Sequence, residues 1–318
     1  MGIQNEIGHG FEYATVMAFC DYFKAQGINY DVVNNTMMSH IRDDYNKHPD
    51  YHDRFQRATQ AAVPVITRLE PNLQVSTNIP ITISVQPDAA GIAGDVRDVL
   101  FQRNDWTIGI SCKHGNEDDK HSRLSNTNDF GESWLGIKCS DQYWADIEPV
   151  INRVFEIRDR QPGVLWRDIP NLYCDFLHPI LAAFAKELTF MDAKYPGEIA
   201  EKFVKYLIGK TDYYKVIAED TNRFTIVEGF NHGGTLNKKI DGRKPLFKIR
   251  KLELPTHFAK IEIDSEDPKH LRILCDRGWN ISIRIHNGDS KVTPSFKLAI
   301  IVDARPLKSL HYEIAPWM

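Results

Sequence analysis

Residues 94–113 read GDVRDVLFQRNDWTIGISCK, and this stretch predicts a β-hairpin. A short apolar strand follows Asp98, a turn is expected at Asn104-Asp105, and a second strand runs from Trp106 to Lys113. Apolar residues at positions 108, 110 and 112 alternate with small or polar residues at 107, 109, 111 and 113, which is the period of two of a half-buried strand. Asp98 and Lys113 are therefore expected to converge on one face of the hairpin.

A carboxylate and a lysine about one strand apart form a minimal site for phosphodiester hydrolysis. A divalent cation held by the carboxylate neutralises the phosphate and lowers the pKa of a bound water. The lysine orients that water or stabilises the charge that develops on phosphorus. The alternative is a surface hairpin in which Asp98 and Lys113 form a weak ion pair, because this spacing occurs in many sequences by chance.

The hairpin resembles the core of PD-(D/E)xK nucleases, in which an aspartate, an apolar strand, a turn and a second strand lead to a lysine. More specifically, residues 94–99, 108–114 and 120–125 resemble type II restriction endonucleases of the HaeIII family. Segments near both ends of the chain agree with this resemblance: GHGFEYA at 8–14, WNISIRIHN at 279–287 and VTPSFK at 292–297.

This resemblance implies an α/β (α+β) fold, with a PD-(D/E)xK restriction-endonuclease-like mixed sheet flanked by helices and a β-rich C-terminal part. It also implies a type II restriction endonuclease that uses Mg²⁺ to hydrolyse double-stranded DNA at a specific sequence. For the namesake of the family that sequence is GGCC, cut to blunt ends with 5′-phosphates. A cognate DNA methyltransferase is then expected to act on the same site, without needing to bind this chain.

The sequence departs from the nuclease pattern at Ser111, where the pattern has an acidic residue two positions before the lysine. A hydroxyl is a poorer ligand for Mg²⁺ than a carboxylate, so a second anionic oxygen is expected from elsewhere. Glu12 is the candidate, because a carboxylate on the largely apolar helix predicted at 11–26 must be paired or bind a metal. Its alternative role is to favour the positive end of the helix dipole. The expected catalytic residues are Asp98, Lys113, Glu12 and Ser111, the expected metal ligands are Asp98 and Glu12, and the reserve ligands are Asp95 and Glu70.

The formal net charge of −4 conceals a basic C-terminal part. From Asn231 to Met318 there are 16 Lys and Arg against 10 Asp and Glu, so the rest of the chain is acidic. The densest cationic stretch follows a glycine-bearing polar loop at 231–237, and together they predict contacts with phosphates and base edges. A solvated charged face is the alternative. The residues expected to bind DNA here are Asn231, His232, Lys238, Lys239, Arg243, Lys244 and Arg284, with Arg243 and Arg284 as candidate base readers.

Residues 114–125 are expected to form a loop that leads from the catalytic lysine into a helix. Its polar side chains can bond phosphate oxygens beside the scissile bond, and the predicted DNA contacts are His114, Lys120, His121, Arg123 and Ser125. Glu117 or Asp118 can also reach the metal. A zinc site at His114 and His121 is disfavoured, because no thiolate or nearer histidine completes the ligand set.

The composition, 42% hydrophobic and 26% charged residues, is that of an ordinary globular protein. No apolar run reaches the ~18 residues of a membrane span, and the N-terminus resembles no signal peptide, so a cytoplasmic location is expected. Five cysteines without a C-x-x-C pair indicate free thiols and argue against structural zinc. Cys112 is expected to pack in the core.

Hydrophobic periodicity predicts helices at 11–26, 53–69, 143–160, 177–194 and 196–208, a polar strand region at 75–86, and mostly strands from Tyr213 onward. A boundary near Gly209 then separates a nuclease core, residues 1–209 with the catalytic hairpin 98–113, from a β-rich DNA-recognition part, residues 210–318. The two parts can also form one domain.

Two other functions are compatible with these residues. A structure-specific repair or recombination nuclease would use the same core to cut junctions or flaps without sequence preference. A catalytically silent DNA-binding protein would explain Ser111 as the mark of a lost site.

Overall fold

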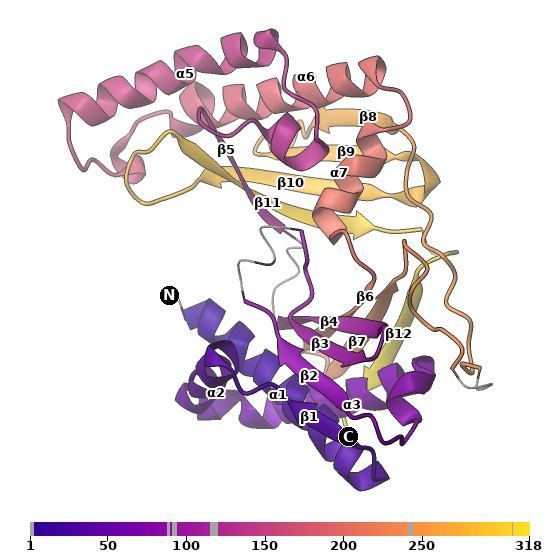
Figure 1. Ribbon diagram of the computed structural model, residues 1–318. Coiled ribbons are helices and arrows are strands. Elements are labelled where there is room, and N and C mark those ends of the chain that lie inside the picture. Colours follow the sequence, from indigo (N-terminus) through magenta and orange to yellow (C-terminus); the bar gives the residue numbers. More distant parts are fainter. Residues whose placement is uncertain (1–2, 88–89, 91–93, 115–119, 241–243, 307) are drawn as a thin grey trace. The chain divides into compact units, whose positions relative to one another are not determined.

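The computed structural model describes residues 3–87, 90, 94–114, 120–240, 244–306 and 308–318, with the backbone alone at Lys120 and His121. The chain forms two compact units. Unit 1 comprises residues 1–117, 209–253 and 307–318, and unit 2 comprises residues 118–208 and 254–306. Each unit has its own sheet (Figure 1).

The sheet of unit 1 has seven strands in the order β1-β2-β3-β4-β6-β7-β12. The pairs β1–β2 and β4–β6 are parallel and the others are antiparallel, so the sheet is mixed. The strands are β1 (Tyr30–Val32), β2 (Ile81–Val85), β3 (Val99–Arg103), β4 (Trp106–His114), β6 (Tyr213–Glu219), β7 (Phe224–Phe230) and β12 (His311–Pro316). Strands β3 and β4 form the predicted hairpin, with Asn104 at a φ of 51° in its turn.

Three helices pack against this sheet, and they are α1 (Ile3–Gln26), α2 (Thr36–Lys47) and α3 (His52–Leu69). Helix α1 lies on β3 and β4, whereas α3 lies on β6, β7 and β12. The shared core is aromatic: Phe11, Phe19 and Phe55 of the helices and Phe101 of β3 are fully buried. Burial of each such side chain contributes about 1.5–3 kcal/mol to the stability of the fold. This packing holds α1 against the β3–β4 hairpin. Short 3₁₀ turns, η1 (Pro49–Tyr51) and η2 (Pro71–Gln74), flank α3.

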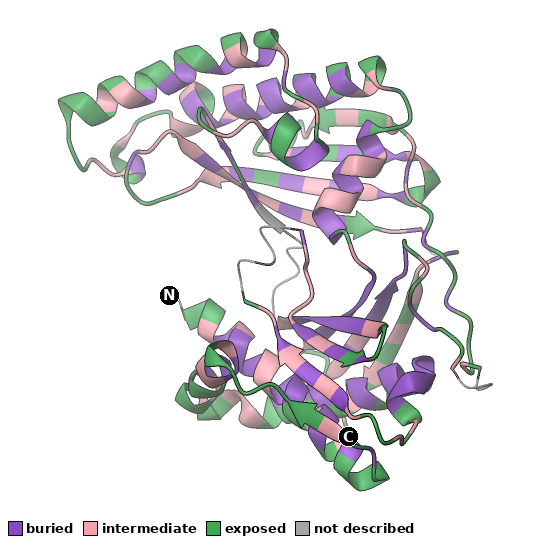
Figure 2. Ribbon diagram, in the orientation of Figure 1, coloured by how far each residue is buried: buried purple, intermediate pink, exposed green. Residues whose placement is uncertain are grey.

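Unit 2 has an antiparallel sheet in the order β5-β11-β10-β9-β8. Its strands are β5 (Lys120–Ser125), β8 (Phe258–Ile263), β9 (His270–Cys275), β10 (Asn280–Asn287) and β11 (Ser295–Ala304). Its helices are α5 (Asp141–Arg160), α6 (His178–Lys194) and α7 (Ile199–Ile208), with short turns η3 (Gly131–Leu135), η4 (Trp166–Asp168), η5 (Tyr173–Leu177) and η6 (Asp276–Gly278). Buried residues alternate along β10 and β11, so one face of this sheet packs on the unit's core (Figure 2).

The predicted fold class is confirmed, and so are the predicted helices, which differ from the observed ones at their ends. Residues 120–125 are different: they form strand β5 and pair with β11, so the expected loop leading into a helix was wrong. Strand β4 is also not half-buried, because both of its faces are covered from Ile108 to Cys112. The Arg97 side chain packs closely over Gly109. A Cβ atom added to Gly109 would lie 2.2 Å from the Arg97 Cδ atom.

The chain passes between the two units four times. The first segment of unit 2 lies within the connection from β4 to β6, and the second lies within the connection from β7 to β12. One of these passages coincides with the predicted boundary near Gly209, but each unit combines segments from both sides of it. The two units are therefore not the consecutive segments 1–209 and 210–318.

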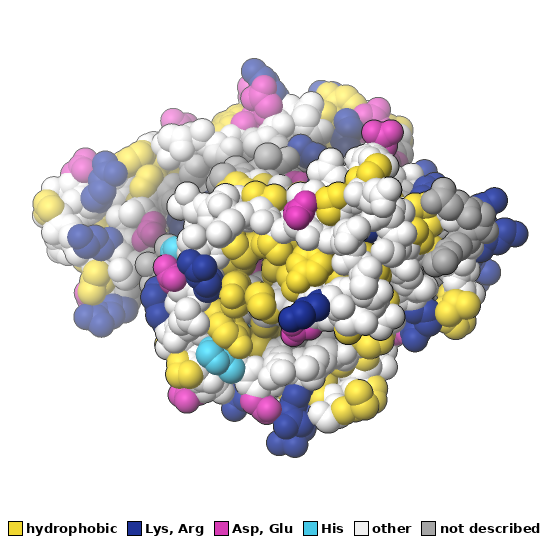
Figure 3. Space-filling view, turned by 60° about the horizontal axis from the view of Figure 1, so that its bottom comes forward, with side chains coloured by type: hydrophobic (Ala, Val, Ile, Leu, Met, Phe, Trp, Pro, Cys, Tyr) yellow, Lys and Arg dark blue, Asp and Glu magenta, His cyan; other side chains and the backbone are white. Residues whose placement is uncertain are grey.

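The surface mixes apolar and charged side chains. On the face shown in Figure 3, hydrophobic side chains gather near the middle, and Lys and Arg side chains lie around them together with acidic ones. The exposed large hydrophobic residues include Val32, Ile79, Phe247 and Ile314. No helix among the described residues is long and apolar enough to cross a bilayer.

Candidate active site

The backbone and neighbouring strands fix Asp98 at the open end of the β3–β4 hairpin. Its N–H donates to the Ile110 carbonyl at 2.8 Å, and its own carbonyl accepts from the Gln86 N–H at 2.9 Å. Its carboxylate Oδ2 accepts a hydrogen bond from the Cys112 N–H at 2.6 Å. The carboxylate is therefore held directly beside β4, one residue before Lys113.

Helix α1 brings Glu12 to the same end of β4. Thr15, one turn further along the helix, lies with its Oγ1 3.4 Å from the Cys112 Sγ, and the rings of Phe11 and His114 are 5.8 Å apart. Burial raises the pKa of the Cys112 thiol well above its ordinary value. The negative charges of Asp98 and Glu12 add to that rise, and Lys113 opposes it. The fold thus brings Asp98, Glu12 and Lys113 together around one buried thiol.

The serine at the departure from the nuclease pattern is buried. Ser111 is 2% exposed and lies opposite Lys215 in the β4–β6 ladder. Cys112 packs in the core of unit 1, as expected. Among the described residues all five cysteines have free thiols.

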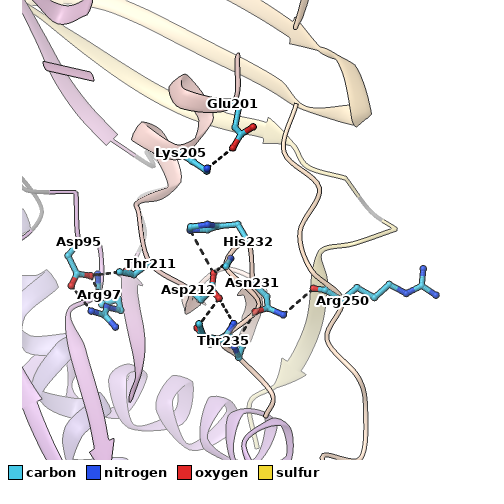
Figure 4. Close-up of polar contacts among 12 residues, drawn as sticks. Asp95, Arg97, Glu201, Lys205, Thr211, Asp212, Asn231, His232, Thr235 and Arg250 are labelled. Atoms are coloured by element: carbon cyan, nitrogen blue, oxygen red, sulfur yellow. Dashed lines mark hydrogen bonds and ion pairs between the residues drawn. The ribbon is translucent and has the colours of Figure 1, made fainter. Parts of the chain in front are cut away.

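The reserve carboxylates have other partners. Asp95 forms an ion pair with Arg97 at 2.7 Å and accepts a hydrogen bond from the Thr211 hydroxyl at 3.2 Å (Figure 4). Burial acts to raise the pKa of Asp95, but the hydrogen bonds and charge of Arg97 hold it below its ordinary value. Asp95 thus positions Arg97, which in turn covers Gly109 of β4.

Glu70, at the end of α3, is fully buried and connects the helix to two distant segments. Its Oε1 accepts from the Tyr214 hydroxyl and from the Asn237 N–H, both at 2.6 Å. Burial raises the pKa of Glu70 to about 7, and these two hydrogen bonds limit the rise. These contacts are structural, because they fasten the polar loop at 231–237 to the body of unit 1.

His114 is packed among the aromatic rings of Phe11, Tyr51 and Phe55. Its Nε2 lies 3.2 Å from Asp220 Oδ1, and only 6% of the side chain is exposed. Burial lowers the pKa of His114, and the Asp220 charge counteracts that effect. A phosphate contact from this histidine requires a rearrangement of its surroundings.

The polar loop at 231–237 is organised by Asp212, which precedes β6 (Figure 4). The Asp212 carboxylate accepts from the Gly233 and Thr235 N–H groups, both at 2.6 Å, and from the Thr235 hydroxyl at 2.8 Å. Asn231 is buried and donates to the carbonyls of Ile249 and Arg250. His232 is 8% exposed, with its Nε2 3.8 Å from Asp212 Oδ1. Asn231 and His232 thus shape the loop from within, and neither is presented as a base reader in this conformation.

The lysines after this loop have the exposure that a phosphate contact needs. Lys238, Lys239 and Lys244 are exposed. Lys238 and Lys239 line a cavity of about 780 Å³ in unit 1, which is also bordered by Arg97, Arg103 and Lys210. Cations outnumber carboxylates around this cavity, so its electrostatic potential favours an anion.

Arg123, Ser125 and Arg284, three further predicted DNA contacts, belong to unit 2. Arg123 of β5 donates to the Ser295 hydroxyl and the Gly288 carbonyl, both at 3.2 Å, and Ser125 bonds Thr127 within its own turn. Arg284 lies exposed on β10. Arg243, the loop carrying Glu117 and Asp118, and the side chains of Lys120 and His121 lie outside the described residues.

Two groups of titratable residues were missed. His9 of α1 and His40 and Asp44 of α2 have ligand atoms within 4.8 Å of one another, and His9 Nδ1 lies 2.7 Å from Asp44 Oδ2. Their i, i+4 spacing in α2 is a sequence signal, but their meeting with His9 depends on helix packing. Lys215 and Glu228 are buried on β6 and β7, and each is a charged residue within a largely apolar segment, which is a signal that the sequence offers.

Comparison with known proteins assigns this architecture. The family model of the HaeIII restriction endonuclease matches residues 8–306, which includes the hairpin, most of helix α1, all of unit 2 and most of unit 1. The chain belongs to the HaeIII restriction endonuclease family. Within that family, it is 31% identical to the type II restriction enzyme HaeIII of Haemophilus aegyptius over 316 residues, covering 98% of each chain. No solved structure matches this chain.

A member of the HaeIII restriction endonuclease family is a type II site-specific deoxyribonuclease, so the chain is a DNA-cleaving enzyme. This identification excludes a catalytically silent binding protein as the best description.

Proposed function

We propose that this enzyme uses Mg²⁺ to cleave both strands of DNA at GGCC, leaving blunt ends with 5′-phosphates. The observation that carries the proposed site is the gathering of Asp98, Glu12 and Lys113 around Cys112. The proposed sequence is the one cut by the namesake of the family. The enzyme would act in the cytoplasm, where a methyltransferase specific for the same sequence protects the cell's own DNA.

The donor set fits magnesium. Asp98 and Glu12 offer carboxylate oxygens, the hard ligands that Mg²⁺ prefers, and Mg²⁺ sites commonly combine one or two carboxylates with waters and substrate phosphates. When bound, the cation would neutralise the scissile phosphate and acidify a water.

The protein side chains then have separate tasks. Asp98, fixed by the Cys112 N–H, provides a rigid carboxylate at the strand end. Glu12 provides a second carboxylate from the buried helix α1. Lys113 orients the attacking water and stabilises the negative charge that develops on the phosphate in the transition state. Ser111, buried between β3 and β6, occupies the acidic position of the pattern without adding a charge.

DNA contact is proposed for cations of both units. Lys238 and Lys239 would neutralise phosphates beside the basic cavity, Lys244 would do so further along, and Arg123, Ser125 and the side chains of Lys120 and His121 would follow the backbone. Arg284, and Arg243 outside the described residues, remain the proposed readers of guanine, since arginine pairs with O6 and N7 in the major groove.

One cleavage experiment tests this proposal. Purified protein is incubated with plasmid DNA and Mg²⁺, with and without EDTA, and the ends of the fragments are sequenced. Discrete fragments that end in GG and CC and that disappear with EDTA are expected. Cutting only at junctions or flaps would instead establish a structure-specific nuclease, and fragment ends at another sequence would refute GGCC.

A further inference from the structure

Four side chains form a row across the sheet of unit 1, which we call the catalytic row: Asp98, Ser111, Lys215 and Glu228. Ser111 lies directly opposite Lys215 in the β4–β6 ladder, and Lys215 lies directly opposite Glu228 in the β6–β7 ladder. Asp98 lies on the other side of β4, where its N–H bonds the Ile110 carbonyl and its carboxylate accepts from the Cys112 N–H. Directly opposite residues share a face of a sheet, so Ser111, Lys215 and Glu228 lie on one face, and Asp98 lies beside the β4 end of the row.

The middle of this row is buried and charged. Ser111, Lys215 and Glu228 are each 2% exposed, and Lys215 is the only lysine that is buried in the described part of the chain. An ammonium group is removed from water only at a large cost, and an opposite charge on the next strand offsets that cost. Glu228 lies directly opposite Lys215 and is the negative charge that can offset this cost.

We propose that Lys215 is a second catalytic lysine, which contacts a non-bridging oxygen of the scissile phosphate, and that Glu228 is the residue that positions it. This inference rests on the proposed site at Asp98. Adjacent strands are about 4.8 Å apart, so an extended lysine side chain reaches past Ser111 toward Asp98. Serine in place of the acidic residue of the pattern leaves room for that side chain and does not divert its charge.

A buried ion pair that serves only the fold has a different energetic signature. Its removal as a pair, with replacement by apolar side chains of similar size, is often neutral for stability. The double variant Lys215→Met/Glu228→Leu therefore separates the two roles, because it removes both charges and keeps the volume.

The experiment measures single-turnover cleavage of a GGCC duplex with Mg²⁺, DNA affinity with Ca²⁺, and thermal melting. The double variant is expected to melt near the wild-type temperature and to bind DNA within about threefold, while its cleavage is at least 100-fold slower. Cleavage by the double variant within about threefold of wild type would overturn the proposal. Wild type and Asp98→Asn are measured in parallel as controls on the proposed function. An inactive wild type would refute the proposed function, and an active Asp98→Asn would refute the proposed site; neither result concerns Lys215.

The variant Glu228→Gln decides the question should the double variant melt early. Glutamine keeps the size of the side chain opposite Lys215 but removes the negative charge that would orient it. Glu228→Gln is therefore expected to cleave at least 10-fold more slowly in a single turnover, while its DNA affinity with Ca²⁺ and its melting temperature stay near those of wild type. Cleavage within about threefold of wild type would overturn the positioning role, as would a loss of cleavage that is accompanied by an equal loss of DNA affinity.

Discussion

Individual residues at the end of the β3–β4 hairpin are proposed to carry the chemistry, and the fold holds them in place in the absence of DNA. The Cys112 N–H orients the Asp98 carboxylate, and packing of α1 places Glu12 near the same thiol. Such fixed charges stabilise a transition state without having to reorganise during the reaction. Replacements at this scale should therefore change the rate of cleavage more than the affinity for DNA.

Lys113→Ala should lower the single-turnover cleavage rate by two to three orders of magnitude, the scale on which one electrostatic group acts in catalysis. DNA affinity measured with Ca²⁺ should change little, because one cation among many is lost. Lys24→Ala, at the exposed end of α1, is the matched control and should cleave normally. Near-normal cleavage by Lys113→Ala would show that the active site does not lie at this hairpin.

Asp98→Asn and Glu12→Gln should each abolish Mg²⁺-dependent cleavage, because an amide is a weaker ligand for a hard cation than a carboxylate. Asp95→Asn should keep measurable activity, since Asp95 is bound to Arg97 and Thr211. Cleavage assays over a range of Mg²⁺ concentrations provide the test. The reverse ranking of the two aspartates would show that Asp95 is the metal ligand.

At the scale of elements, the loop at 231–237 is held by buried carboxylates from two directions. Asp212 binds the beginning of the loop, and Glu70 binds Asn237 at its end. Asn237 also donates to the Leu69 carbonyl at 2.7 Å, which joins the loop to the end of α3. The position of Lys238 and Lys239 thus depends on two buried carboxylates at either end of the preceding loop.

Glu70 should make stability depend on pH. Its pKa rises from 4.5 to about 7 on folding, so its favourable contribution is complete below pH 4.5 and is lost as the pH rises through 7. The loss is about 3 kcal/mol, on the scale of 1.36 kcal/mol per pKa unit. Urea unfolding of wild type and Glu70→Gln at pH 5 and pH 8 should show a smaller decline in the variant. Glu148→Gln, at an exposed position of α5, should decline like wild type, and equal declines in all three proteins would contradict the buried position of Glu70.

The elements whose pattern is local were predictable from the sequence. The hairpin follows from alternation around a turn, and the long helices follow from apolar spacing, so both agree with the structure. Strand β5 was missed because KHSRLS has one apolar residue, and its partner β11 lies about 170 residues further on. The burial of Asn231 and His232, two predicted DNA contacts, was not predictable because it depends on tertiary structure. The catalytic row also depends on the pairing of β4 with β6, which lies about 100 residues further along the chain, so no local sequence pattern predicts it.

On the scale of the whole molecule, an acidic protein binds an acidic polymer by concentrating its cations. The formal net charge is −4, yet the part from Asn231 onward is basic. The exposed Lys238 and Lys239 border a cavity with further cations, whereas Arg284 lies exposed on the sheet of unit 2. A lysine that contacts a phosphate, the role proposed for Lys238 and Lys239, contributes affinity for DNA of every sequence. An arginine that contacts a base, the role proposed for Arg284, contributes only at the cognate site.

Lys238→Ala and Lys239→Ala should weaken binding to cognate and scrambled duplexes alike, and each should lower the salt dependence by about one counterion. Arg284→Ala should weaken cognate binding by about 1–3 kcal/mol more than scrambled binding. Affinities for both duplexes at two salt concentrations, measured with Ca²⁺ to prevent cleavage, distinguish these outcomes. Equal losses on the two duplexes would remove Arg284 as a base reader.

The two passages through unit 2 also set the order in which the nuclease can assemble during synthesis. The hairpin with Asp98 and Lys113 leaves the ribosome about 100 residues before β6, and the edge strand β12 is made last. Pairing of segments so far apart is slow and requires both to be present. An unfinished chain therefore carries its hairpin without the neighbouring strand that supplies Lys215. In the proposed site, the catalytic face would therefore stay incomplete until β6 and β7 have been synthesised.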